Sequence, residues 1–151
     1  MAGSIAGIVY RIVPADLHAH LFEVTLDVAH PDPEGQRFAL PAWIPGSYML
    51  REFARHVVAI EASAEGRPLA LHKLDKHTWV TDACKDPVQV LYRVYAWDLS
   101  VREAHLDATH GFFNGTSVFL RVLGQEREPC TVFLDPPGEA AACGWEVATT
   151  L

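Results

Sequence analysis

The chain has 151 residues, of which 50% are apolar and 21% are charged, which fits one globular domain and excludes a disordered chain. Nineteen acidic and twelve basic residues give a net charge of -7, which repels phosphate backbones and anionic lipid. We therefore expect neither nucleic acid nor a membrane as a partner. The sequence predicts a cytoplasmic protein, and a periplasmic location stays open if a leader peptide preceded it.

The predicted elements of the first half are short strands separated by turns. Residues 8–13 form the first, and residues 20–28 alternate strictly between apolar and polar side chains, which is typical of a half-buried strand. Residues 57–64 alternate again and place Val58, Ile60, Ala62 and Ala64 on one face. Two further short strands are predicted at residues 68–71 and 78–81.

The second half continues this pattern. Residues 88–97 are apolar on both faces and predict a central strand that is covered on both sides. Residues 116–123 and 130–134 flank a Gly-containing turn and predict a hairpin, and residues 145–149 predict a last strand. Helical signals are confined to residues 48–56 and 102–106.

Together these elements predict an all-β fold, either an antiparallel β-sandwich or a curved saddle-like sheet with little helix. The sequence stops within a strand-like pattern, so we expect it to be a piece of a longer protein. Its three cysteines, Cys84, Cys130 and Cys143, are odd in number and lack a C-x-x-C spacing. They are predicted to be reduced, packed thiols in a reducing compartment.

The eight histidines raise the question of a metal site. His18 and His20 would share one face of a strand, and His105 and His110 lie in a loop with Asp107 between them. The favoured interpretation is that these histidines bond to backbone or water and that this chain binds no metal. No H-E-x-x-H, G-x-S-x-G or phosphate-binding G-K-[ST] motif occurs in the 151 residues.

Two segments, residues 40–56 and 97–119, carry more aromatic and polar side chains than a simple core requires. They could form a contact surface, and Asn114 with Gly115 is a strong signal for a two-residue turn. The plainer interpretation is that Phe112 and Phe113 close one end of the fold and that Arg102 makes an internal ion pair.

Four motifs in this sequence resemble the amino-terminal domain of the glycyl aminopeptidases, a family of zinc metallopeptidases that often carry a carboxy-terminal PDZ domain. They read W-I-P-G-S-Y-x-x-R-x-F-A-R-H, K-x-D-K-x-T-W, Y-x-V-Y-A-x-D-x-S-V-R and H-G-F-F-N-G-T-S. The motifs begin at Trp43, Lys73, Tyr92 and His110, and the resemblance covers residues 10–151.

The resemblance implies that residues 1–151 are a single β-rich, non-catalytic domain. In that family the zinc ligands and the catalytic glutamate lie in a thermolysin-like domain, which we expect downstream; no cofactor or catalytic residue is expected in this segment. The amino-terminal domain packs on the catalytic domain and helps bind the amino end of a peptide. Asn114, Gly115, Thr116 and Tyr48 are the residues we expect to face that domain or its cleft.

Two alternatives stay open. A stand-alone β-sandwich module could grip carbohydrate or peptide through an aromatic surface made of Trp43, Tyr48, Trp79 and Trp97. A small metalloprotein could instead use His18 and His20 with His105 or His110. If the chain is instead the amino-terminal domain of an aminopeptidase, we expect the isolated segment to be inactive and to self-associate through an exposed interdomain face.

Overall fold

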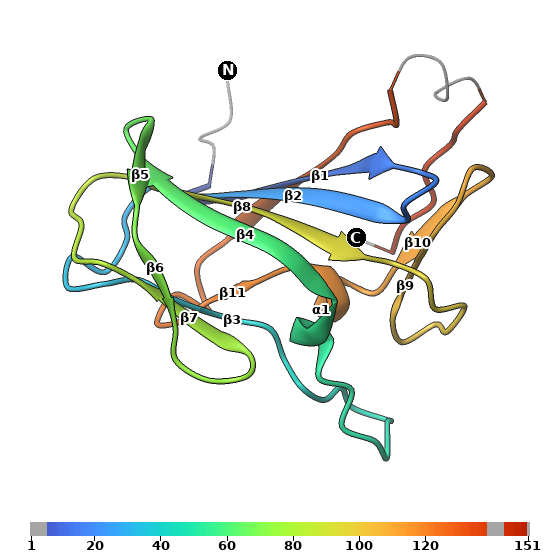
Figure 1. Ribbon diagram of the computed structural model, residues 1–151, viewed down its shortest axis with the longest axis horizontal. Helices are drawn as coiled ribbons and strands as arrows, with labels where there is room; N and C mark the ends of the chain where they lie inside the picture. The colour runs from blue at the N-terminus through green and yellow to red at the C-terminus, as the bar shows by residue number, and fades with distance from the viewer. Residues whose placement is uncertain (1–5, 139–143, 151) are drawn as a thin grey trace.

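The computed structural model describes residues 6–138 and 144–150 and confirms the all-β prediction (Figure 1). A six-stranded sheet has the order β12 (Cys130–Leu134), β1 (Ile8–Asp16), β2 (Leu21–Val28), β8 (Val88–Tyr95), β4 (Val57–Ala64) and β5 (Arg67–Leu69). A four-stranded sheet has the order β11 (Arg121–Val122), β3 (Arg37–Ala39), β7 (Thr78–Thr81) and β6 (Leu71–Lys73). The remaining elements are a hairpin of β9 (Ala104–Leu106) and β10 (Gly111–Phe113), the 3-10 turn η1 (Phe53–His56) and the short helix α1 (Gly115–Val118).

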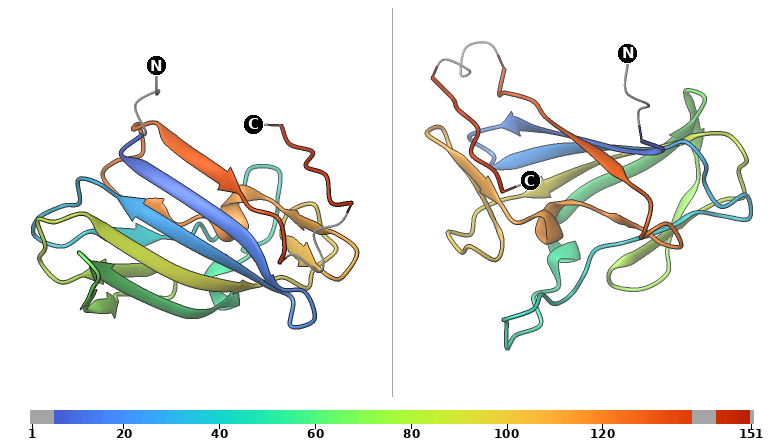
Figure 2. Two further views of the ribbon diagram at one scale, coloured as in Figure 1. Left: turned by 90° about the horizontal axis from the view of Figure 1, so that it is seen from above. Right: turned by 180° about the vertical axis from the view of Figure 1, so that it is seen from behind.

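The core lies between the inner face of the large sheet and the layer that contains the smaller sheet, and the large sheet is twisted (Figures 1 and 2). On β2 the predicted alternation is confirmed, because Phe22, Val24, Leu26 and Val28 are buried. Opposite them lie apolar side chains from the second layer and from its connections: Phe38, Leu40, Phe53, Val118, Leu120 and Val122.

Strand β8 is central, between β2 and β4, but the prediction that both of its faces are covered is wrong. Val88, Val90, Tyr92 and Val94 are buried, whereas the other face carries exposed Gln89, Arg93 and Tyr95 with half-buried Leu91. These outer residues pair across the sheet, for example Arg93 Nε with Glu23 Oε2 at 2.9 Å. The strand therefore has one covered face, as in most antiparallel sheets.

Two buried tyrosines fasten the segment after α1 to the large sheet. Tyr92 donates to the Val118 carbonyl at 2.6 Å and accepts from the Leu120 N–H at 3.0 Å. Tyr10 donates to the Leu120 carbonyl at 2.6 Å. Burial raises the pKa of both phenols well above the usual value, so both remain donors at every working pH. This bonding sets the position of α1 relative to the sheet.

The predicted hairpin of residues 116–123 and 130–134 is wrong. Its first arm begins in α1 and ends in β11, which pairs with β3 of the smaller sheet. Its second arm, β12, runs parallel to β1 at the edge of the large sheet. Helix α1 replaces a strand because the Asn114 side chain caps its first turn, while the tyrosine hydroxyls bond to the backbone that would otherwise pair in a ladder.

Other predictions need smaller corrections. Residues 48–56 are helical only in η1, residues 102–106 contain β9 instead of a helix, and no strand occurs within the described residues 144–150. The register of β4 shifts between Val57 and Ala59. Val58 is therefore exposed and does not share the face of Ile60, Ala62 and Ala64 as predicted. Strand β3 was not predicted.

Cys84 and Cys130 are free thiols; Cys84 is half-buried, whereas Cys130 is exposed, so the prediction that it is packed is wrong. Cys143 lies outside the described residues. In the part of the chain that the structure describes, no helix is long and apolar enough to cross a membrane.

Candidate functional site

A loop of residues 42–51, here called the tip loop, projects from the lower end of the molecule (Figure 1). Its turn follows from the sequence: Ser47 N–H donates to the Ile44 carbonyl at 3.2 Å, with Pro45 and Gly46 between them. Gly46 has a φ of 84°, which a type II turn requires at its third position and which favours glycine. The proline-glycine pair thus fixes the direction in which the tip points.

The base of the tip loop is closed by hydrogen bonds. The Ala42 carbonyl accepts from Arg51 N–H at 2.7 Å, and the Trp43 indole donates to the Ser47 carbonyl. The Ser47 side chain is buried within the loop and accepts from Arg51 Nε at 3.4 Å. Such closure makes the loop a shaped protrusion, because its backbone groups are already satisfied internally.

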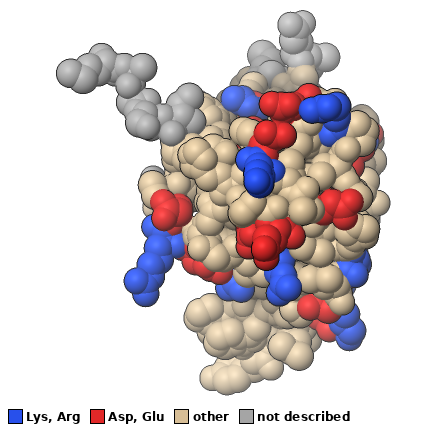
Figure 3. All heavy atoms as spheres, turned by 90° about the vertical axis from the view of Figure 1, so that its left-hand side faces the viewer, with Lys and Arg blue, Asp and Glu red and all other residues tan. Residues whose placement is uncertain are grey.

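The outside of the tip is apolar or uncharged. Its exposed side chains are Trp43, Tyr48, Met49 and Leu50, and Tyr48 is fully exposed. Figure 3 shows the projecting lower end without acidic or basic side chains on the face in view, whereas the body above it carries many. An exposed apolar cluster on a rigid support is typical of a surface that contacts another protein.

Glu103 joins the tip loop to the rest of the site. Its carboxylate is only 4% exposed and lies 3.3 Å from Arg51 Nη1 and 3.3 Å from His56 Nε2. Arg55 Nη2 lies 3.8 Å away, on the more exposed side. A buried carboxylate requires positive partners, so these pairs draw the base of the tip loop and η1 against the start of β9. The expectation of an ion pair at Arg102 is wrong, since Arg102 is exposed and no ion pair of the described residues involves it.

Asn114 caps α1 and does not form the predicted two-residue hairpin turn. Its Oδ1 accepts from the Thr116 N–H at 3.1 Å and from the Thr116 hydroxyl at 2.6 Å. Its carbonyl accepts from the N–H and the hydroxyl of Ser117 at 2.9 and 2.7 Å. Its φ of -87° and ψ of 132° are extended values typical of an N-cap.

The Asn114 turn, residues 114–116, lies directly beside the Glu103 pairs, because the Asn114 N–H donates to the Glu103 carbonyl at 3.0 Å. Gly115 and Thr116 line a hollow of about 480 Å³ together with the residues at the base of the tip loop. Three of the four expected site residues thus gather at the base of the loop, while Tyr48 lies at its outer end. Their contact with a catalytic domain remains a prediction.

The histidines are not grouped as the sequence predicted. His18 and His20 lie in the turn between β1 and β2, so the prediction that they share a strand face is wrong. His20 Nδ1 lies 2.7 Å from the Leu106 carbonyl, and its ring stacks on Trp97 with centroids 3.8 Å apart. On the other side His105 stacks on Trp97 at 4.9 Å, and His110 follows at 5.2 Å. We call these four side chains the ring column.

Asp107 contacts a ring nitrogen of each of the last two histidines of the column. Its Oδ2 lies 2.9 Å from His105 Nε2, and its Oδ1 lies 3.5 Å from His110 Nδ1. Hydrogen bonds from Thr109, then from His105, hold the pKa of the Asp107 carboxyl well below its usual range. Among the described residues, His105, Asp107 and His110 form a group whose ligand atoms all lie within 4.8 Å of one another.

The aromatic surface of the stand-alone module does not form as one patch. Trp79 is 4% exposed and belongs to the core of the smaller sheet, where Lys73 Nζ lies 5.3 Å from its ring. Trp97 is part of the ring column, while Trp43 and Tyr48 lie on the tip loop. A flat platform of all four side chains is therefore wrong.

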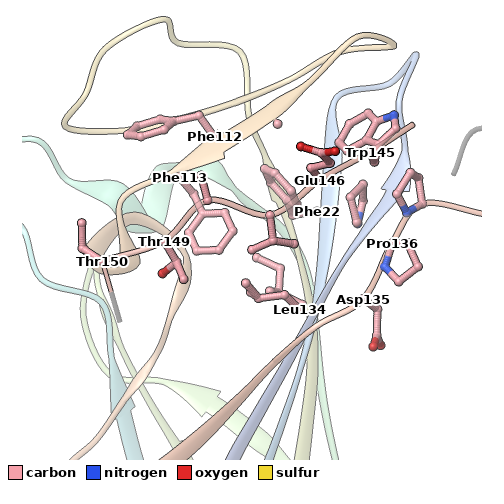
Figure 4. Close-up of a pocket in the computed structure, with 16 residues that line it drawn as sticks. Phe22, Phe112, Phe113, Leu134, Asp135, Pro136, Trp145, Glu146, Thr149 and Thr150 are labelled. Carbon is pink, nitrogen blue, oxygen red and sulfur yellow. The ribbon is translucent and has the colours of Figure 1, made fainter. Parts of the chain in front are cut away.

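A second hollow, of about 540 Å³, opens between the β10 end of the molecule and residues 145–150 (Figure 4). Its walls are mostly apolar; Phe113 packs edge-on against Phe22 at 5.5 Å, and Trp145 is half-buried. The Asp135 carboxylate at its margin pairs with Arg11 at 2.8 Å. Phe113 closes this end of the fold as expected, while Phe112 is exposed.

Comparison with known protein families shows which family the chain belongs to. The model of the peptidase M61 N-terminal domain matches residues 9–151. The chain belongs to this family. A solved structure described as an aminopeptidase N family protein from Idiomarina loihiensis is 47% identical and superimposes with a TM-score of 0.85. That match covers 88% of this chain and 22% of the other, so the chain spans about a fifth of its relative's length. No curated protein sequence matches the chain.

The peptidase M61 N-terminal domain described here does not carry the zinc-binding motif of a metallopeptidase. The 151 residues contain no H-E-x-x-H, so the ligands and the glutamate base of such a centre are not in this sequence. Most of the tip loop lies within the first of the four motifs, and the Asn114 turn lies within the fourth, which begins at His110.

Proposed function

We propose that this chain is the non-catalytic amino-terminal domain of a zinc-dependent aminopeptidase. In that protein it packs against the catalytic domain and helps shape the site that receives the amino end of the peptide. The family match over residues 9–151 supports this proposal, as does the relative in which the matching part is about a fifth of the chain. A cytoplasmic location suits the free thiols of Cys84 and Cys130.

The observation that carries the proposal is the tip loop. It presents four exposed, uncharged side chains on a backbone closed at its base, and it is held by the buried Glu103 carboxylate. Exposed apolar area gains about 25 cal/mol for each Å² that a partner covers. A protrusion that its own hydrogen bonds hold in shape loses less conformational entropy on docking than an open loop, so more of this gain contributes to binding.

The Asn114 turn supports the second half of the proposal. Helix α1 is linked through Glu103 to the base of the tip loop, so a domain docked on the tip also lies near the hollow at Gly115 and Thr116. A peptide amino group is a cation that oxygen atoms bind well. The net charge of -7 also favours the approach of cations to this chain.

The proposal is tested by reconstitution. The 151-residue chain alone, the remaining part of the aminopeptidase alone, and their mixture are assayed with a short peptide and with its N-acetylated form. We expect no cleavage by the chain alone, and a mixture that lowers the KM for the free peptide more than for the acetylated one. Cleavage by the 151 residues, or identical KM values with and without them, would contradict the proposal.

The same surface predicts self-association of the isolated chain. Without a partner domain, the tip side chains are exposed to water and can cover one another. Sedimentation of the 151-residue chain should show concentration-dependent dimers or larger species. A chain that stays monomeric up to millimolar concentration would argue against an apolar docking surface.

A further inference from the structure

The hairpin of β9 and β10 brings three potential metal ligands to one face. His105 and Asp107 are two residues apart, so their side chains leave the strand on the same side. Asp107 and His110 face each other at the end of the hairpin, where the Asp107 N–H donates to the His110 carbonyl at 3.0 Å. The spacing H-x-D-x-x-H across this turn therefore places the three side chains together.

The donor atoms already lie near the separations that a metal ion imposes. Zinc binds nitrogen and oxygen at roughly 2.0–2.2 Å, which puts neighbouring ligand atoms of a tetrahedron roughly 3.3–3.5 Å apart. Asp107 lies 2.9 Å from His105 Nε2 and 3.5 Å from His110 Nδ1. The His110 side chain is 57% exposed, and its Nδ1 lies 2.9 Å from the Thr109 hydroxyl. It would exchange this contact for a shared ion as it turns to close the last separation.

The buried member of the trio is preorganised and incompletely bonded. His105 is 4% exposed, and its ring is held between Trp97 and His110. Its Nδ1 is a buried atom with no hydrogen-bond partner among the described residues. Without a metal, Nε2 bonds to Asp107. Metal binding places the ring proton on Nδ1, where the bond to the ion has to offset a buried N–H without an acceptor, and the Nε2 lone pair then binds the cation.

The carboxylate is also fixed in place. Asp107 Oδ1 accepts from the Thr109 N–H at 2.7 Å and from the Thr109 hydroxyl at 2.6 Å. The ion pairs of Asp107 within the described residues are those with the two histidines, so no lysine or arginine competes with a metal there. A bound ion would replace the hydrogen bond between His105 Nε2 and Asp107 Oδ2, while the bonds from Thr109 would keep the backbone of residues 107–110 in place.

We propose that His105, Asp107 and His110 bind one divalent transition-metal ion, with zinc as the expected ion and water completing its coordination. Two imidazoles and one carboxylate are a donor set that suits zinc, nickel and copper better than calcium or magnesium. This inference goes beyond the proposed function and beyond the expectation that these histidines bond only to backbone or water. It adds a metal ion at the end of the ring column.

The test titrates the untagged 151-residue chain with zinc chloride by calorimetry, and with nickel chloride by tryptophan fluorescence. We expect one zinc per chain. Nickel should quench part of the emission, because Trp97 stacks on His105, and Trp97→Phe should remove the quenched part. The variants His110→Ala and Asp107→Asn should each weaken zinc binding roughly tenfold or more.

The matched control is His72→Ala. His72 Nε2 and Asp82 Oδ1 form an exposed pair at 2.7 Å, so they reproduce the His–Asp contact without a second histidine. This variant should bind zinc as the unmodified chain does. The proposal is overturned if zinc does not bind, or if His110→Ala and Asp107→Asn bind it as tightly as His72→Ala. Circular dichroism of each variant confirms that the fold is retained.

Discussion

The tip loop and the Asn114 turn lie at the two ends of the same cluster of contacts, and they are built in opposite ways. The tip presents Tyr48 and its neighbours to solvent, with the polar groups of the loop turned inward. The Asn114 turn uses its side-chain oxygen and backbone to cap α1 and to bond Glu103. The difference indicates that the tip loop contacts a partner, whereas the Asn114 turn holds α1 and Glu103 in position.

This comparison predicts that substitutions in the supporting region lower the free energy of unfolding, while substitutions at the tip alter association alone. The largest effect is expected at the junction between the two.

Glu103→Gln should lower the free energy of unfolding by about 3 kcal/mol, because Arg51 is left partly buried without its carboxylate. Urea denaturation measures the loss. The control is Glu52→Gln, which removes an exposed pair with Lys76 and should cost less than about 1 kcal/mol. Equal losses in the two variants would show that the Glu103 pairs do not support the loop.

Tyr92→Phe should cost about 1–3 kcal/mol, since the Val118 carbonyl and the Leu120 N–H lose a buried partner. The measurement is again denaturation, with Tyr95→Phe as the control on the exposed face of the same strand. If Tyr92→Phe were as stable as Tyr95→Phe, the attachment of α1 to the sheet would rest on packing and on the Tyr10 hydrogen bond to the Leu120 carbonyl.

Asn114→Ala should cost about 1 kcal/mol through loss of the helix cap, and Asn114→Asp should retain most of the stability. In the complete aminopeptidase, Asn114→Ala should also raise the KM for short peptides with a free amino group. If Asn114→Asp loses as much stability as Asn114→Ala, the capping role is wrong. A KM unchanged in both variants would remove Asn114 from the substrate site.

Tyr48→Ser should change the free energy of unfolding by less than about 0.5 kcal/mol, because the side chain is fully exposed. It should nevertheless reduce self-association in sedimentation experiments. Phe133→Ser serves as the control, since Phe133 lies on the outward side of β12 at the far edge of the large sheet. A loss of stability at Tyr48 would mean that the tip is part of the core.

The sequence predicted local patterns well and long-range pairing poorly. The alternation of β2 follows from side-chain period alone, whereas the central place of β8 was predicted correctly from a coverage of both faces that the structure does not show. The parallel pairing of β12 with β1 joins residues more than a hundred positions apart, and no local signal reports it. Val118, Leu120 and Val122 alternate like a strand, yet the buried tyrosines and the Asn114 cap give that segment a different backbone.

The sequence motifs of the site were predicted, but the hydrogen bonds and ion pairs that connect them were not. The tip loop follows from its proline-glycine turn, and the Asn114 turn was placed correctly in sequence but given the wrong geometry. The central role of Glu103 could not be predicted, because a single glutamate outside any recognised motif of acidic residues is normally solvated. The trio of His105, Asp107 and His110 could have been found from its spacing once the hairpin was recognised.

The most direct test of the account measures binding of the 151-residue chain to the separately produced remainder of the aminopeptidase. We predict that the double variant Tyr48→Ser with Leu50→Ser binds at least about tenfold more weakly than the unmodified chain, a loss of about 1.4 kcal/mol. Phe133→Ser should bind as the unmodified chain does. Equal affinity of the tip variant and the unmodified chain would contradict the claim that the tip loop is the docking surface.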